Sequence, residues 1–125
     1  MTIASADSGG RAWASPMAYA YDRAYHFYFI SLPHSKHATN FLAKPRVSVA
    51  IFDSRQAFGE GVGLQIEGTV KMVRPSDLSQ VERTYVTRKW PFVSPKHKKY
   101  LAGCHAILGN KSYRAYCFSP TKVWM

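Results

Sequence analysis

The chain has 125 residues and a mass of 14.1 kDa, which fits one domain and is too short for two. Hydrophobic residues make up 46% and charged residues 19%, a composition that excludes a disordered tail. The 17 Lys and Arg against 7 Asp and Glu give a formal net charge of +10. This excess predicts an anionic partner, either a nucleic acid, a membrane surface or a phosphorylated small molecule.

Membrane and metal classes receive no support from the sequence. No apolar run approaches the roughly 18 residues that span a bilayer, and the first residues lack the basic flank of a signal peptide. We therefore expect a soluble, cytoplasmic protein with no membrane partner. Cys104 and Cys117 stand outside any CxxC motif and without paired histidines, which predicts free thiols and no metal site.

The first half reads as strands separated by turn signals. Residues 1–6 and 12–21 form two strands around the turn Asp7-Ser8-Gly9-Gly10. Residues 25–30 are aromatic and β-branched without interruption, which predicts a strand buried on both faces. Helical spacing over residues 36–43 ends before Pro45.

The second half begins with an apolar strand over residues 47–52 and a glycine-containing turn over 53–63. Residues 64–72 then alternate, with Leu64, Ile66, Gly68, Val70 and Met72 on the buried face. Ser76 reads as the N-cap of a helix to about residue 89, with an apolar stripe of Leu78, Val81, Tyr85 and Val86. A short helix from Ser94 to Leu101 and a strand over residues 113–118 follow.

Consecutive strands with short turns and few helices predict a mainly β (α+β) domain, an antiparallel barrel or sandwich with helices at its ends. The early strands are too close together in sequence for the crossover helices of a parallel sheet.

The chemically informative stretch is Ser-Leu-Pro-His-Ser-Lys-His-Ala-Thr-Asn, residues 31–40, where a buried strand meets a helix. Ser35, Lys36 and His37 fall in the first turn of that helix and Asn40 one turn later. Free backbone N–H groups and a partial positive charge make a helix N-terminus suitable for phosphate. The alternative is that Ser35 is only an N-cap and Lys36 only a solvated side chain.

Five stretches together resemble a known family in their order and spacing. They are Gly10-Arg11-Ala12-Trp13-Ala14-Ser15-Pro16, Tyr28-Phe29-Ile30-Ser31, Ser35-Lys36-His37-Ala38-Thr39-Asn40-Phe41, Pro45-Arg46-Val47, and Gly63-Leu64-Gln65-Ile66-Glu67-Gly68-Thr69. The family is that of the FMN-binding split barrels related to pyridoxamine 5'-phosphate oxidase. Residues 113–124 resemble its closing strand, whereas residues 76–110 contribute little.

The resemblance implies a six-stranded antiparallel split β-barrel, a single FMN-binding domain over residues 1–125, and a homodimer with cofactor sites between the subunits. It places the FMN phosphate at Ser35, Lys36 and His37, near Asn40. It implies that Gln65 and Trp124 contact the flavin from the partner subunit. It places the flavin ring against residues of the two preceding strands, namely Ser15, Pro16, Met17, Ala18, Ile30 and Ser31.

One departure from the family is visible in the phosphate motif. The usual Arg-Lys pair stands here as Lys36-His37, which keeps one fixed charge and makes the second depend on pH near neutrality. The resemblance implies an oxidoreductase that passes hydride between FMN and an unidentified small molecule. No side chain stands out as a general acid or base, and His26, His34, His97 and His105 occur singly.

Two alternatives remain open at this point. The same barrel can take haem or a deazaflavin in place of FMN. A nucleic-acid or polyanion-binding module is the other reading, based on the basic flank over residues 83–99. Its basic residues are Arg83, Arg88, Lys89, Lys96, Lys98 and Lys99, and its candidate exposed aromatics are Tyr85 and Trp90.

Overall fold

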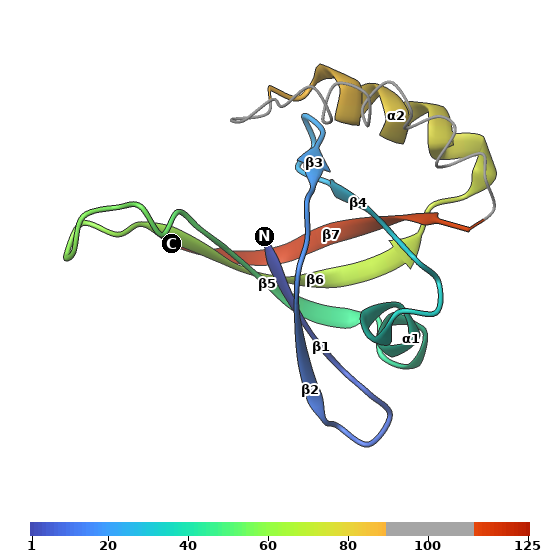
Figure 1. Cartoon of the computed structure of the whole chain (residues 1–125), viewed down its shortest axis with the longest axis horizontal. Helices are drawn as coiled ribbons and strands as arrows, with labels where there is room; N and C mark the ends of the chain where they lie inside the picture. The colour runs from blue at the N-terminus through green and yellow to red at the C-terminus, as the bar shows by residue number, and fades with distance from the viewer. Residues whose placement is uncertain (90–111) are drawn as a thin grey trace.

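The structure is a computed structural model that describes residues 1–89 and 112–125. Its strands form one antiparallel sheet in the order β2-β1-β5-β6-β7-β4-β3, curled into a half-barrel, with α1 and α2 on opposite sides of β4 (Figure 1). The strands are β1 (Thr2–Ala6), β2 (Ala12–Pro16), β3 (Ala20–Tyr21), β4 (Phe27–Ser31), β5 (Arg46–Phe52), β6 (Gly63–Met72) and β7 (Arg114–Trp124). The helices are α1 (Lys36–Ala43), the 3-10 turn η1 (Pro75–Asp77) and α2 (Leu78–Thr87). The mainly β (α+β) class is confirmed.

Within residues 1–89 and 112–125 the sheet has seven strands where six were predicted, because residues 12–21 do not form one strand. Pairing with β1 ends at Pro16, and β3 then pairs with β4 at the other end of the sheet order. The chain between them has to leave one edge of the sheet and join the other. A continuous strand cannot do this.

The prediction that residues 25–30 form a strand buried on both faces is confirmed from Phe27 onward, whereas Tyr25 is 66% exposed and precedes β4. Phe27 and Phe29 are buried in the main core with α1, whereas Tyr28 is buried in a smaller core beneath α2. Burying an aromatic or aliphatic side chain of this size contributes roughly 1.5–3 kcal/mol. The strand therefore anchors both helices to the sheet.

The alternation along β6 is also confirmed, with Ile66, Gly68 and Val70 buried. Met72 is an exception, 45% exposed at the strand end. Gly68 lies at a bulge in the β6–β7 pairing, where an added Cβ would overlap the Ser119 carbonyl oxygen. β7 continues beyond the predicted end at residue 118, since this bulge accommodates Pro120 opposite Gly68.

The predicted start of α2 is wrong in detail. Ser76 lies inside η1, and Asp77 precedes α2 without a side-chain capping bond. Val81 and Tyr85 form the buried face of α2, but Val86 is 55% exposed. Tyr85 is 2% exposed, so the idea that it is an exposed aromatic for nucleic acid is also wrong.

Several sequence features lie outside the described residues. They are Trp90, the predicted helix from Ser94 to Leu101 with its lysines, His97, Cys104 and His105. Within residues 1–89 and 112–125, Cys117 carries a free thiol, and no group of His, Cys, Asp and Glu side chains is arranged to hold a metal ion. In the same part of the chain no helix is long and apolar enough to cross a membrane.

Candidate functional site

The half-barrel has a seam where the two ends of its sheet approach each other, and His37 bridges it. β2 and β4 lie near opposite ends of the strand order, yet both contact the His37 side chain. Its Nδ1 atom lies 3.2 Å from Ser15 Oγ of β2, and its Nε2 atom lies 2.6 Å from Ser31 Oγ of β4. One imidazole on α1 therefore joins strands that have no backbone pairing with each other.

Ser35 completes this serine–histidine cluster, which consists of Ser15, Ser31, Ser35 and His37. The Ser35 hydroxyl lies 2.8 Å from His37 Nε2 and 3.4 Å from Ser31 Oγ. It also accepts a hydrogen bond from Ala38 N at 3.4 Å, as an N-cap does. The prediction that Ser35 caps the helix is confirmed, and the structure brings the cap together with two further hydroxyl groups.

The positive electrostatic potential of the cluster comes from the N-terminus of α1 rather than from His37. Partial burial lowers the pKa of His37, because the imidazolium loses hydration there. The backbone N–H groups of Lys36 and His37 belong to the first turn of α1, where no helix carbonyl can reach them. A neutral imidazole, three hydroxyl groups and two amides thus converge at a helix N-terminus.

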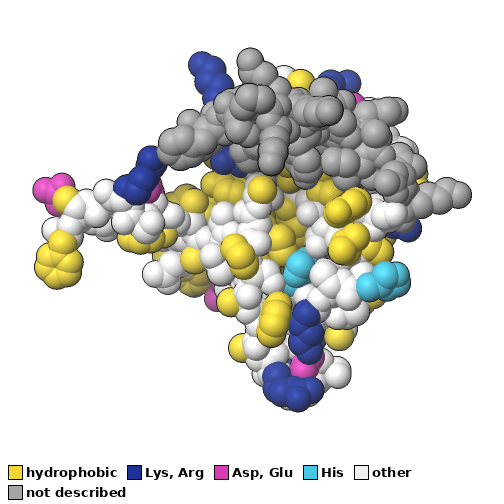
Figure 2. Space-filling view, in the orientation of Figure 1, with side chains coloured by type: hydrophobic (Ala, Val, Ile, Leu, Met, Phe, Trp, Pro, Cys, Tyr) yellow, Lys and Arg dark blue, Asp and Glu magenta, His cyan; other side chains and the backbone are white. Residues whose placement is uncertain are grey.

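Lys36 lies at the rim of the cluster and turns toward the β1–β2 hairpin. Its Nζ atom is 3.5 Å from Asp7 Oδ2, which Arg11 Nε also contacts at 2.9 Å. The Arg11 backbone N–H, followed by its guanidinium and then Lys36, lowers the pKa of Asp7 to about 2. The hairpin tip is the lower group of acidic and basic side chains in Figure 2.

Asn40 is not brought to the cluster. Its side chain is 2% exposed and donates a hydrogen bond from Nδ2 to Ser5 Oγ at 3.0 Å, which ties α1 to β1 in the core. The sequence already indicated that the Asn40 side chain is buried, because Asn40 falls beside Phe41 on the apolar side of the helix.

Pro16, Met17 and Ala18 line a cavity of about 800 Å³. Ser15 and Pro16 are neighbours on β2, so their side chains lie on opposite faces of the strand. The cavity and the cluster are therefore separated only by β2, whose outer side has no strand beside it in the described part of the sheet. Ile30, by contrast, packs against the smaller core beneath α2, away from this cavity.

The sequence analysis missed several residues of this cavity. Arg88 lines it from α2, with its guanidinium carbon 4.5 Å above the centre of the Tyr19 ring. The Met1 amino group donates to the Met17 carbonyl at 3.1 Å, and burial, followed by the charge of Arg88, lowers its pKa. No local spacing in the sequence connects Arg88 with Met17, which lie on different elements.

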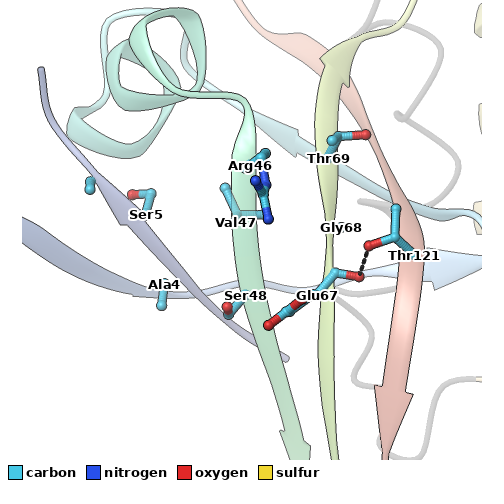
Figure 3. Close-up of a pocket in the computed structure, with 10 residues that line it drawn as sticks. Ala4, Ser5, Arg46, Val47, Ser48, Glu67, Gly68, Thr69 and Thr121 are labelled. Atoms are coloured by element: carbon cyan, nitrogen blue, oxygen red, sulfur yellow. Dashed lines mark hydrogen bonds between the residues drawn. The ribbon is translucent and has the colours of Figure 1, made fainter. Parts of the chain in front are cut away.

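Gln65 and Trp124 lie far from Pro16, on the outer face of the sheet. The strand registers place Pro16, Thr2, Ala50, Gln65 and Trp124 in one row across five strands. Four strand spacings separate the ends of the row by about 19 Å. Gln65 and Trp124 line a cavity of about 580 Å³, next to another of about 320 Å³ that includes Ser48 and Glu67 (Figure 3).

The sequence and fold were compared with known proteins. A family model described as pyridoxamine 5'-phosphate oxidase matches residues 1–125. The chain belongs to this family. The resemblance predicted from the ordered motifs is thereby confirmed, and no curated protein matches the chain.

Solved structures extend this pyridoxamine 5'-phosphate oxidase fold to proteins with different ligands. The haem storage protein HutZ from Vibrio cholerae superposes with a TM-score of 0.75 and 17% identity, over 99% of this chain and 83% of that one. A FAD-binding protein from Mesorhizobium loti superposes with a TM-score of 0.68 and 19% identity, over 98% of this chain and 80% of that one. For a putative pyridoxamine 5'-phosphate oxidase from Listeria innocua, the TM-score is 0.62 and the identity 14%, over 98% of this chain and 84% of that one. These similarities show the fold alone.

Proposed function

We propose that this chain is an FMN-dependent oxidoreductase of the pyridoxamine 5'-phosphate oxidase family, with residues 1–125 forming a single FMN-binding domain. The observation that carries the proposal is the convergence of Ser31, Ser35 and His37 at the N-terminus of α1. When bound, FMN supplies hydride transfer to or from an unidentified small molecule. The protein binds and orients it.

The serine–histidine cluster fits a phosphate. The hydroxyl groups of Ser31 and Ser35 can donate to phosphate oxygens, as can the amides of Lys36 and His37. A phosphate dianion beside His37 would favour the imidazolium, which burial disfavours in the free protein. Lys36 is 45% exposed, and its contact with Asp7 is a surface ion pair worth about 0–1 kcal/mol. Its ammonium group can therefore turn to a phosphate at little cost.

The cavity of about 800 Å³ is suited to the ring. Pro16, Met17 and Ala18 supply an apolar wall on one side of this cavity. Arg88 places positive charge at the same cavity. That charge favours electron density on a ring held there.

A second copy of the chain would complete the site. Gln65 and Trp124 lie too far from Pro16 to reach the same flavin ring within one chain, because the separation is about 19 Å. The outer face of β1 and β5 between them is exposed and built from small side chains, among them Thr2, Ala4, Ser48 and Ala50. Such a face lets another sheet approach closely. We place Gln65 and Trp124 at the partner's flavin.

Haem is the alternative that the fold relatives raise, since HutZ is a haem storage protein. Among the described residues, no histidine lines the cavity of about 800 Å³. Both ring nitrogens of His37 contact serine hydroxyls, and His26 Nδ1 contacts Asp22. This arrangement favours a phosphate-bearing flavin over haem.

The first experiment is an FMN titration of the purified protein, followed by absorbance and by quenching of flavin fluorescence. We expect saturable binding at micromolar FMN, and at least a tenfold weaker affinity for Ser31→Ala and Ser35→Ala. Ser79→Ala makes the same chemical change on the exposed side of α2 and serves as the matched control. Absence of binding at micromolar FMN, or a haem spectrum with tighter haem binding, would contradict the proposal. A copurified deazaflavin would replace FMN as the cofactor.

The dimer is tested separately by light scattering after size exclusion. Ala4→Arg puts a charge in the middle of the small-residue face and is expected to yield monomers. Trp124→Ala is expected to keep the dimer but weaken FMN binding about tenfold or more, as loss of a buried aromatic anchor does. A wild-type monomer that binds FMN normally would remove Gln65 and Trp124 from the site.

A further inference from the structure

The turn between β3 and β4 presents two aromatic rings to solvent. Tyr21 and Tyr25 are 53% and 66% exposed, and their rings are nearly parallel, with centroids 6.5 Å apart and planes 10° apart. Tyr25 has a positive φ of 61°, which is unfavourable for a residue with a bulky side chain. Its ring gains little burial in return.

Asp22 holds this turn rigidly. Its Oδ1 atom accepts hydrogen bonds from the backbone N–H groups of Ala24 and His26, both at 2.9 Å. Its Oδ2 atom accepts from the Tyr28 hydroxyl at 2.9 Å and lies 3.1 Å from His26 Nδ1. The strained conformation of Tyr25 is thus imposed by a partly buried hydrogen-bond network. Strain held in this way is common at ligand-binding sites.

The two rings form one wall of a groove, and α2 forms the other. Gln80, Arg83, Thr84 and Thr87 recur at helical spacing on the side of α2 that faces the turn, whereas Val81 and Tyr85 face the core. Two cavities of about 500 and 540 Å³ share Tyr21, Thr84 and Thr87, so they form a continuous depression. We call it the tyrosine groove.

The tyrosine groove is strongly basic. Its lining includes Arg23 and Arg83 at one end and Arg88 and Lys89 at the other. The only acidic residue among the described lining is Asp22, whose carboxylate is occupied by the four contacts above. Among the described residues, no carboxylate lies within ion-pair distance of Arg23, Arg83 or Lys89.

We propose that the tyrosine groove binds a free nucleotide, with the base stacked on Tyr21 and Tyr25 and the phosphates held by Arg23 and Arg83, which line the same end of the groove. Aromatic faces beside arginines match a planar ring joined to an anion, because stacking and cation contacts then act together. A simple polyanion would make no use of the exposed rings, and an apolar ligand would leave the charges of Arg23, Arg83 and Lys89 unmatched. The helix α2, which lines the groove, lies on the other side of β4 from α1, whose first turn carries the serine–histidine cluster (Figure 1).

Calorimetric titration of the full chain, saturated with FMN where FMN binds, tests the proposal with ATP, adenosine and tripolyphosphate. We expect ATP to bind at least tenfold more tightly than either fragment. Tyr25→Asn removes the ring but tolerates the positive φ, and it should weaken ATP binding at least fivefold. Arg83→Gln should have a similar effect. Lys44→Gln, which removes one exposed charge at the end of α1, is the matched control and should leave ATP binding unchanged.

Several results would overturn the proposal. Equal affinity for ATP and tripolyphosphate, with no effect of Tyr25→Asn, would indicate a polyanion surface. Equal affinity for ATP and adenosine would remove the phosphate contacts. A twelve-residue deoxythymidine oligonucleotide that binds more than tenfold more tightly than ATP would assign the groove to a nucleic-acid strand. If Ser35→Ala lost ATP binding while Tyr25→Asn bound ATP as the wild type does, ATP would belong at the proposed FMN phosphate site.

Discussion

The two ends of the seam are bridged in different ways. At the α2 end, the Tyr85 hydroxyl donates toward the backbone carbonyls of Ala18 and Tyr28, at 3.3 and 3.1 Å. At the α1 end, the polar contacts of His37 among the described residues are with side-chain hydroxyl groups. Both residues join the segment around β2 to β4. Tyr85 is 2% exposed inside an apolar core, whereas His37 is half-buried beside an exposed lysine.

This difference separates a structural bridge from the binding site that we propose. Backbone carbonyls have fixed positions, so Tyr85 stabilises one geometry of the seam and has nothing to offer a ligand. Hydroxyl groups can rotate and can exchange His37 for another partner. The end of the seam with mobile polar groups is therefore the end at which an anion can be exchanged for internal hydrogen bonds.

The largest expected effect is that of Tyr85→Ala. It removes a buried aromatic ring and leaves two carbonyls without their donor, so the free energy of unfolding should fall by about 3–5 kcal/mol. Urea denaturation followed by circular dichroism measures this loss. Tyr85→Phe keeps the ring and should cost less, about 1–3 kcal/mol. A loss below about 1 kcal/mol for Tyr85→Ala would show that the α2 end does not hold the seam.

Lys36→Ala should leave the stability nearly unchanged but weaken FMN binding. Its surface contact with Asp7 contributes little to stability, so the free energy of unfolding should change by less than about 1 kcal/mol. Loss of a charged hydrogen bond to phosphate should weaken FMN binding by about 1.5–3 kcal/mol. Fluorescence titration gives the affinity and urea denaturation the stability. An unchanged affinity for FMN would remove Lys36 from the phosphate site.

The smallest effect is a pH dependence at His37. Its pKa is lowered in the folded protein, so the unfolded chain takes up this proton first as the pH falls below about 6.5. The unfolded state then binds more protons, and the stability of the flavin-free protein should decrease as the pH falls from about 7.5 to 5. His37→Gln should flatten this slope relative to wild type. If urea denaturation gave the wild type and His37→Gln the same change of stability with pH, His37 would not be the cause of that change.

The sequence predicted much of the fold from local pattern. Alternation along β6, the doubly apolar run of β4 and the Ser35 cap of α1 depend on near neighbours, and the structure has all three. The division of residues 12–21 into β2 and β3 was not predictable in this way. It depends on which distant strand each half pairs with.

Within the candidate site, the sequence located Ser35, Lys36 and His37 through the strand-to-helix junction and the family resemblance. It placed Asn40 with them, although packing against β1 turns that side chain to Ser5. It missed Arg88, which reaches the cavity only because α2 folds back over the β2–β3 connection.

By itself, the sequence determined the family, the mainly β class and the position of the α1 N-terminus, because these depend on local pattern and on ordered motifs. Only the tertiary structure decided that Ser15, Ser31 and Ser35 meet on one imidazole. It also decided that the rings of Tyr21 and Tyr25 lie beside the arginines of α2. The physical reason is the strand order, in which curling brings together the two ends of a sheet whose strands are distant in sequence.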